Sequence, residues 1–256
     1  MSIAEILELR KAANARPAGT AVAVIGSGGK TTLVWLLAST FRHERVLVTT
    51  TVKMWLPEPD QYDAFPDPAV FTAAGPAAQA APPGITFAGV RLSAEGKIGA
   101  LPPEALASRR THFDKLFIEA DGSRRRPYKG WADHEPVVPE WTDLTIAVLP
   151  PPQSGRIVSE ACVHRLPEFL AISGAVPGEP LRPAHLAAAI AHPNGLLARA
   201  RGRIVLFFSQ VETGEARKAA EETAALLPPA CRERLWKIVA GSACDNTAEA
   251  IGICRS

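Results

Sequence analysis

A glycine-rich turn between two apolar segments constrains the fold of this chain more than any other feature. The sequence from residue 21 to residue 37 reads AVAVIGSGGKTTLVWLL, which predicts a buried strand, a tight turn and an apolar helix. Glycine adopts backbone conformations that other residues resist, and the free N–H groups at a helix N-terminus attract anions. We therefore predict a phosphate-binding loop whose nucleotide contacts come from Gly26, Ser27, Gly28, Gly29, Lys30, Thr31 and Thr32.

Two side chains at the start of the predicted helix carry the chemistry of this loop. Lys30 is expected to reach the outer phosphates of ATP or GTP, and the Thr31 hydroxyl to ligate the accompanying Mg²⁺. The loop is shorter than the pattern G-x-x-x-x-G-K-[ST], because Val24 stands where the first glycine belongs. The remaining motif, from residue 26 to residue 32, resembles the loop of Mur-ligase-type ATP-binding proteins.

Apolar strands alternate with helical segments along the chain, which predicts a three-layer α/β fold of the P-loop NTPase type. The strands at 45–51 and 144–149 are continuously apolar, a pattern typical of a mostly parallel sheet with helices on both faces. We predict a single domain over residues 1–256, with a possible sub-boundary at the proline run 150–152, because consecutive prolines continue neither a helix nor a central strand. Further strands are expected at 115–120, 203–208 and 235–240, a hairpin at 85–101, and helices in the first dozen residues and at 68–74, 103–110, 160–173, 183–191 and 215–227.

Composition indicates an ordinary soluble enzyme. A hydrophobic content of 47% over 256 residues is enough to bury a core, and a net charge of +2 gives no support for a nucleic-acid partner. The sequence has no apolar run of 18 residues, and its N-terminus carries acids where a signal peptide carries positive charge. We therefore expect a cytoplasmic protein without a membrane partner. The four cysteines lack metal-ligand spacing and are expected to be reduced thiols.

Two carboxylates at the carboxyl end of the predicted strand at 115–120 complete the expected nucleotide site. Glu119 and Asp121 are two residues apart, so their side chains point the same way if the strand continues. A phosphate loop needs a carboxylate at the end of a neighbouring strand to hold or position the metal. We therefore expect Thr31, Glu119 and Asp121 to form the Mg²⁺ site, with the two carboxylates sharing metal ligation and water activation.

A dense positive cluster comes directly after these carboxylates, in the segment SRRRPYK from residue 123. Guanidinium groups bind phosphate and carboxylate oxygens in pairs, so Arg124 and Arg125 suit an anionic substrate or the phosphoryl group in transfer. His134, which lies between two acids, is a candidate general base or ligand to a second cation.

Three further residues are candidate nucleotide contacts at the ends of other strands. Thr50 or Thr51 ends the second strand, where many nucleotide hydrolases place a threonine that senses the γ-phosphate. Glu212 ends the segment Ser209-Gln210-Val211-Glu212, which stands where GTPases carry Asn-Lys-x-Asp to recognise guanine. Glu212 thus supplies a carboxylate that could hydrogen-bond to the nucleotide base, but the choice between ATP and GTP stays open.

Taken together, these motifs resemble those of the YqeC-type proteins, described as selenium-dependent hydroxylase accessory proteins or selenium cofactor biosynthesis proteins. The resemblance covers residues 20–212, and its motifs are specific to the family without being specific to a reaction. It implies a P-loop nucleotide-binding fold and a partner among molybdenum-containing hydroxylases or their maturation proteins. The residues that carry it are the segments 26–32, 48–55, 119–127, 134–136, 163–165 and 192–196.

Three functions are compatible with these residues. The first is Mg²⁺-dependent binding and hydrolysis of ATP or GTP, coupled to maturation of the cofactor of a partner hydroxylase. The second is an ATP-dependent ligase or kinase, in which the arginine cluster holds a small anionic acceptor. The third is a non-catalytic module that binds nucleotide as a regulatory ligand.

Overall fold

Eight strands form one mostly parallel sheet that runs through the whole protein. The computed structural model describes residues 1–9, 18–73, 81–93, 96–153 and 155–252. The strand order is β13-β12-β11-β9-β1-β7-β2-β4, and every pairing is parallel except that of β12 with β13. The strands are β1 (Thr20–Gly26), β2 (Arg45–Thr50), β4 (Gly84–Ala88), β7 (Lys115–Glu119), β9 (Leu144–Leu149), β11 (Arg203–Phe208), β12 (Lys237–Ser242) and β13 (Thr247–Gly252).

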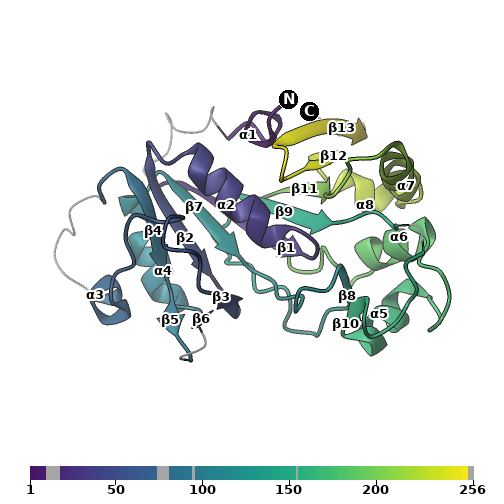
Figure 1. Cartoon of the computed structure of the whole chain (residues 1–256), viewed down its shortest axis with the longest axis horizontal. Helices are drawn as coiled ribbons and strands as arrows, with labels where there is room; N and C mark the ends of the chain where they lie inside the picture. The colour runs from purple at the N-terminus through teal and green to yellow at the C-terminus, as the bar shows by residue number, and fades with distance from the viewer. Residues whose placement is uncertain (10–17, 74–80, 94–95, 154, 253–256) are drawn as a thin grey trace.

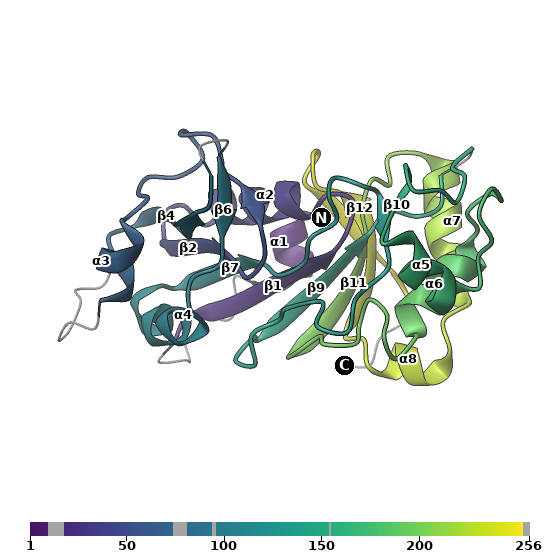
Figure 2. The ribbon, with the colours of Figure 1, turned by 90° about the horizontal axis from the view of Figure 1, so that it is seen from below.

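Helices cover both faces of this sheet, because alternate residues of its strands are apolar on each side. Val22 and Val24 of β1 face one cluster, and Ala23 and Ile25 face another. On the first face lie α1 (Ile3–Ile6) and α2 (Lys30–Thr40); Figure 2 shows α2 and α4 on opposite sides of β1 and β7. The opposite face carries α3 (Pro68–Thr72), α4 (Pro103–Arg109), α5 (Leu166–Ser173), α6 (Pro183–Ala191), α7 (Gly214–Ala225) and α8 (Pro229–Glu233).

Two small sheets extend from the carboxyl ends of the main strands. One contains β3 (Met54–Trp55), β6 (Lys97–Gly99) and β5 (Val90–Arg91), in that order and antiparallel. The other pairs β8 (Tyr128–Lys129) with β10 (Val163–His164) in parallel. In Figure 1 these sheets lie on either side of the segment that runs from β7 to β8, below the start of α2.

The predicted α/β class and mostly parallel sheet are confirmed, and most predicted elements lie within a few residues of their expected bounds. The strands beyond the proline run, β11 and β12, join the same sheet as β1, as the sequence predicts. None of the helices that the structure describes is both long and apolar enough to span a membrane. Cys162, Cys231 and Cys244 are free thiols, while Cys254 lies outside the described residues.

Three predicted elements differ from the structure. The hairpin at 85–101 is divided at Gly89, where an added Cβ would lie 2.3 Å from Ile98 Cγ2. Its first part, β4, joins the main sheet, and only β5 and β6 form the hairpin. The predicted helix at 160–173 begins only at Leu166, because β10 and a left-handed Arg165 (φ +55°) precede it. The first helix ends by residue 6, and its predicted continuation from residue 10 lies outside the described residues.

Candidate active site

The predicted site residues gather at one edge of the sheet, where the parallel strands end. The turn after β1, which we call the glycine loop (residues 26–29), connects β1 to α2. Thr50 ends β2 and Glu119 ends β7, and both strands lie on the same side of β1. On the other side, Ser209 directly follows β11. Parallel strands all present their carboxyl ends at the same edge, so four distant segments of the sequence meet there.

Two hydrogen bonds from serine hydroxyls help to fix the glycine loop. Ser27 Oγ donates to the carbonyl oxygen of Pro127 at 2.7 Å, and Ser209 Oγ donates to the carbonyl oxygen of Gly28 at 2.5 Å. Gly28 (φ +66°) and Gly29 (φ +118°) both occupy the left-handed region, which an L-residue rarely adopts. The sequence therefore needs glycine at these two positions, and the loop leads directly into Lys30, the first residue of α2.

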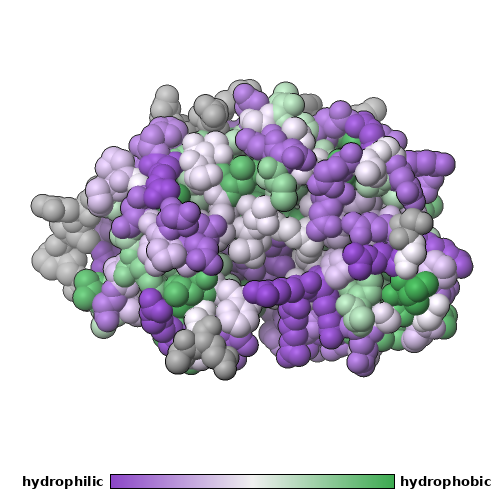
Figure 3. Space-filling view, in the orientation of Figure 1, coloured by the Kyte–Doolittle hydropathy of each residue, from purple (hydrophilic) through white to green (hydrophobic). Residues whose placement is uncertain are grey.

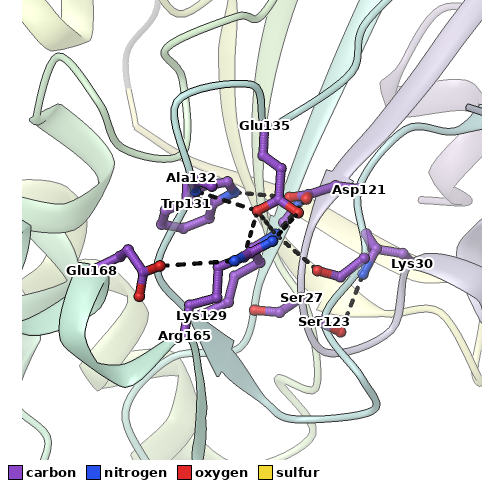
Figure 4. Close-up of polar contacts among 12 residues, drawn as sticks. Ser27, Lys30, Asp121, Ser123, Lys129, Trp131, Ala132, Glu135, Arg165 and Glu168 are labelled. Carbon is purple, nitrogen blue, oxygen red and sulfur yellow. Dashed lines mark hydrogen bonds and ion pairs between the residues drawn. The ribbon is translucent and has the colours of Figure 1, made fainter. Parts of the chain in front are cut away.

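The ammonium group of Lys30 is buried at the start of α2. Its side chain is 4% exposed, and Nζ donates to Ser123 Oγ at 3.3 Å, as Figure 4 shows. Burial lowers the pKa of Lys30, and the more distant charges of Glu119 and Asp121 oppose this effect. Within the described part of the chain, no carboxylate forms a direct ion pair with Lys30 Nζ. The site thus holds a desolvated positive charge whose direct partner is a neutral hydroxyl.

A hydroxyl and a carboxylate lie together beside this lysine. Thr31 Oγ1 donates to Glu119 Oε2 at 2.7 Å, and Glu119 is 6% exposed. Burial raises the pKa of the Glu119 carboxyl, while the positive charge of Lys30 and the hydrogen bond from Thr31 oppose the rise. Hydroxyl and carboxylate oxygens are ligands that Mg²⁺ accepts, so this pair fits a hydrated Mg²⁺ ion.

Asp121, the other carboxylate that the sequence assigns to Mg²⁺, has both of its oxygens engaged by protein donors. Oδ1 accepts from Lys129 Nζ at 2.5 Å, and Oδ2 accepts from the backbone N–H of Gly26 at 2.9 Å and from Trp131 Nε1 at 2.8 Å. The side chains of Asp121 and Lys129 are both fully buried. In this geometry Asp121 holds the end of β1 through its hydrogen bond from Gly26, and its part in an Mg²⁺ site stays a prediction.

The Asp121–Lys129 pair continues into a wider charge network that the sequence patterns do not reveal. Lys129 Nζ also contacts Glu135 Oε2 at 3.2 Å, and Glu135 Oε2 contacts Arg165 Nε at 3.0 Å. Arg165 in turn contacts Glu168 in the first turn of α5 (Figure 4). These ion pairs connect the backbone of the glycine loop to the start of α5. The acidic motif DHEP at residues 133–136 could have pointed to this network. Its Glu135, and not its histidine, forms the ion pairs.

The arginine cluster forms a turn, one end of which contacts the glycine loop and the other the first residue of α2. Ser123 contacts Lys30 and Pro127 contacts Ser27, so the arginines occupy the turn between these contacts. Arg124 (φ +49°) and Arg125 (φ +61°) are both left-handed and exposed. Figure 3 shows hydrophilic side chains gathered where the segment from β7 to β8 lies in Figure 1.

Other predicted residues lie at the same edge but differ in exposure. Thr50 Oγ1 is buried and donates to the carbonyl oxygen of Glu119 at 2.8 Å, and Thr51 Oγ1 donates to the carbonyl oxygen of Val137 at 2.7 Å. Both hydroxyls thus brace neighbouring loops. Thr32 and His134 are exposed, as is Glu212 beyond the end of β11.

His164 on β10 lies beside Lys129 on β8, and this position gives a pH-dependent prediction. Burial, followed by the charges of Lys129, Arg165 and Arg124, lowers the pKa of His164 to about 4. The unfolded chain, with an ordinary histidine pKa near 6.5, therefore binds more protons than the folded protein between about pH 6.5 and pH 4. Stability is lost as the pH falls through this window, by about 1 kcal/mol after allowance for the side chain's partial exposure.

We expect His164→Gln to reduce this acid sensitivity, as measured by urea unfolding at pH 7.5 and pH 5. The variant should retain a residual loss of stability in acid, because burial also lowers the pKa of His185. Equal acid sensitivity in the wild type and His164→Gln would contradict the prediction.

The fold and the site define an α/β protein with a glycine loop, a buried lysine and a hydroxyl–carboxylate pair at the carboxyl edge of its sheet. A family model described as YqeC protein matches residues 22–167. The uncharacterized protein YqeC of Escherichia coli (strain K12) is 36% identical over 181 residues, which cover 69% of each chain. This chain therefore belongs to the YqeC family. The matched family segment includes the glycine loop and the charge network as far as Arg165, whereas Glu168, β11, β12 and β13 lie beyond it.

Proposed function

We propose that this protein binds a nucleoside triphosphate with Mg²⁺ at the glycine loop and hydrolyses its terminal phosphate. The observation that carries the proposal is the buried ammonium of Lys30, which has a neutral Ser123 hydroxyl as its direct partner. A desolvated charge of this kind is costly unless an anion binds next to it. Its position at the start of α2, directly after the glycines, is the position at which backbone N–H groups also attract phosphate.

Each residue of the site has a defined part in this proposal. Backbone N–H groups of residues 28–30 bind phosphate oxygens, and Lys30 offsets the negative charge that develops on the outer phosphates. Thr31 and Glu119 hold Mg²⁺, which neutralises phosphate charge and orients the oxygens when bound. Asp121 keeps the end of β1, and therefore the loop, in its binding geometry through its hydrogen bond from Gly26.

A second reaction on the same scaffold is transfer of the phosphoryl group to a small anionic acceptor. The arginine turn favours it, because Arg125 lies 5.2 Å from the centre of the Trp55 ring, on the small sheet beside the loop. Lys97 lies 5.3 Å from the same ring, so Arg125 and Lys97 together would offer two positive charges to an anionic acceptor. Phosphate release that requires an added organic acid would identify this ligase or kinase reaction.

The cellular role that we propose is that of an accessory factor in the maturation of molybdenum-containing hydroxylases that carry selenium. The support is the resemblance of the motifs to those of YqeC-type proteins so described. Coupling of turnover to a client predicts that phosphate release rises when such a hydroxylase, or one of its maturation proteins, is added.

The binding site is tested by titrating the protein with ATP, GTP and their diphosphates, with and without Mg²⁺, and following heat or thermal stabilisation. We expect Mg²⁺ to strengthen triphosphate binding, and Glu119→Gln to remove most of this Mg²⁺-dependent gain, by about 10-fold in affinity, because a neutral amide binds the cation weakly. Glu140→Gln, an exposed change outside the site, should behave as wild type.

Three results would oppose parts of the proposal. Absence of stabilisation by any nucleotide would show that the glycine loop serves another purpose. Mg²⁺-dependent binding that survives Glu119→Gln unchanged would move the metal to another ligand, such as Asp121. Binding without phosphate release, with or without acceptors, would favour the non-catalytic module.

A further inference from the structure

A cavity of about 340 Å³ lies at the carboxyl ends of β11 and β12, at the same edge of the sheet as the glycine loop. It is bounded by the loop that follows β11, by the start of α7, by the end of β12 and the start of β13, and by Met1. The reaction at the phosphates uses none of these elements. Its lining includes Val211, Glu212, Thr213, Arg217, Gly241 and Glu249.

Direct contacts connect this cavity to the glycine loop. Ser209 Oγ donates to the carbonyl oxygen of Gly28, and two residues further on Val211 N donates to the carbonyl oxygen of Gly241 at 3.1 Å. Between these two contacts lies Gln210, whose backbone is left-handed (φ +59°). The segment that bounds the cavity therefore also contacts the glycine loop, which makes the cavity a candidate for the part of a ligand that extends beyond its phosphates.

The charged groups of the cavity leave one carboxylate available to a ligand. Arg217 forms ion pairs with Glu221 of its own helix and with Glu249 of β13, so its charge is engaged. Glu212 is exposed, and within the described part of the chain its carboxylate has no hydrogen-bond or ion-pair partner. Val211, Ala240 and Ala248 supply apolar wall. A carboxylate beside an apolar wall repels phosphate and accepts hydrogen bonds from the N–H edge of a flat ring.

We propose that this cavity binds the base of the nucleotide and that Glu212 makes guanine the preferred base. The inference rests on the proposed function and adds the identity of the substrate to it. Guanine carries two adjacent donors, N1–H and the 2-amino group, which match the two oxygens of a carboxylate. Adenine carries the acceptor N1 next to its 6-amino group, so one carboxylate oxygen would face a lone pair. A site that leaves a polar group unpaired with the wrong base discriminates strongly against it.

The test compares the affinities of Mg²⁺–GDP and Mg²⁺–ADP by calorimetry on the wild type, on Glu212→Gln and on Glu215→Gln. Glu215 lies in the first turn of α7 outside the cavity lining, so its variant controls for the loss of one negative charge. We expect the wild type and Glu215→Gln to prefer GDP by about 10-fold or more, and Glu212→Gln to lose most of this preference. Glu212 is exposed, and unchanged thermal unfolding would confirm that the variant folds.

Binding of a different base by the Glu212→Gln variant provides a second, independent test. Xanthine has a carbonyl oxygen where guanine has its 2-amino group, and the amide of glutamine can donate to that oxygen while accepting from N1–H. Glu212→Gln is therefore expected to bind xanthosine diphosphate more tightly than the wild type does.

The outcomes separate the failure of this inference from that of the proposed function. Binding that depends on Lys30 but shows equal affinity for the two bases, prefers ADP, or keeps its GDP preference in Glu212→Gln would overturn the guanine assignment and leave the nucleotide site in place. Failure of every nucleotide to bind would overturn both.

Discussion

Replacement of Lys30 by methionine is expected to weaken binding of nucleoside triphosphates by about 100-fold, because a desolvated ammonium–phosphate hydrogen bond is lost. The same substitution is expected to leave the protein as stable as the wild type, or more stable. Burial lowers the pKa of Lys30, which means that the folded protein disfavours the charged form more than the unfolded chain does. Methionine has a similar volume without the charge, so it removes this cost.

If Lys30→Met weakens nucleotide binding without lowering the stability of the protein, the lysine serves binding and not folding. A lysine that holds the fold together would lower both quantities when it is replaced. The measurements are calorimetric titration with Mg²⁺–nucleotide and urea unfolding without ligand. Lys53→Met is the matched control, because Lys53 is an exposed lysine in the segment that follows β2. Full affinity in Lys30→Met, or a large loss of stability, would contradict the role that we assign to this residue.

The sheet and the glycine loop are predictable from the sequence because their signals are local. Continuous apolar runs such as those of β1 and β9 occur in strands that are buried on both faces, and both strands lie where the sequence places them. The contact between Thr31 and Glu119 agrees with the expectation that strands adjacent to β1 deliver carboxylates to the loop. The edge strand β13 escapes prediction because its sequence TAEAIG is largely exposed and has no continuous apolar signal.

The difference between Glu119 and Asp121 could not be read from their spacing. Both lie at the carboxyl end of β7, and two carboxylates two residues apart give the same sequence signal. The donors that distinguish them, Lys129 and Trp131, come from the chain after it has turned back at the arginine cluster. This turn depends on the left-handed backbone of Arg124 and Arg125. Arginine seldom adopts this conformation, and no sequence pattern predicts it.

Replacement of Lys129 by methionine is expected to lower the free energy of unfolding by about 3–5 kcal/mol, because it leaves the fully buried carboxylate of Asp121 without its ion-pair partner. Urea unfolding measures this loss. Lys218→Met removes a lysine from an exposed pair with Glu222 on α7, and should change stability by less than about 1 kcal/mol.

The double variant Asp121→Asn/Lys129→Met decides whether the loss comes from the unpaired charge or from the lysine itself. Asparagine keeps an oxygen that can accept from Gly26 N–H and Trp131 Nε1 but carries no charge to compensate. The double variant should therefore recover much of the stability that Lys129→Met loses, since neutral replacements avoid burying an uncompensated charge. A double variant no more stable than Lys129→Met would show that Lys129 acts mainly through Glu135 and the start of α5. Recovery would instead show that the pair holds the end of β1, and with it the glycine loop, through compensation of charge inside the protein.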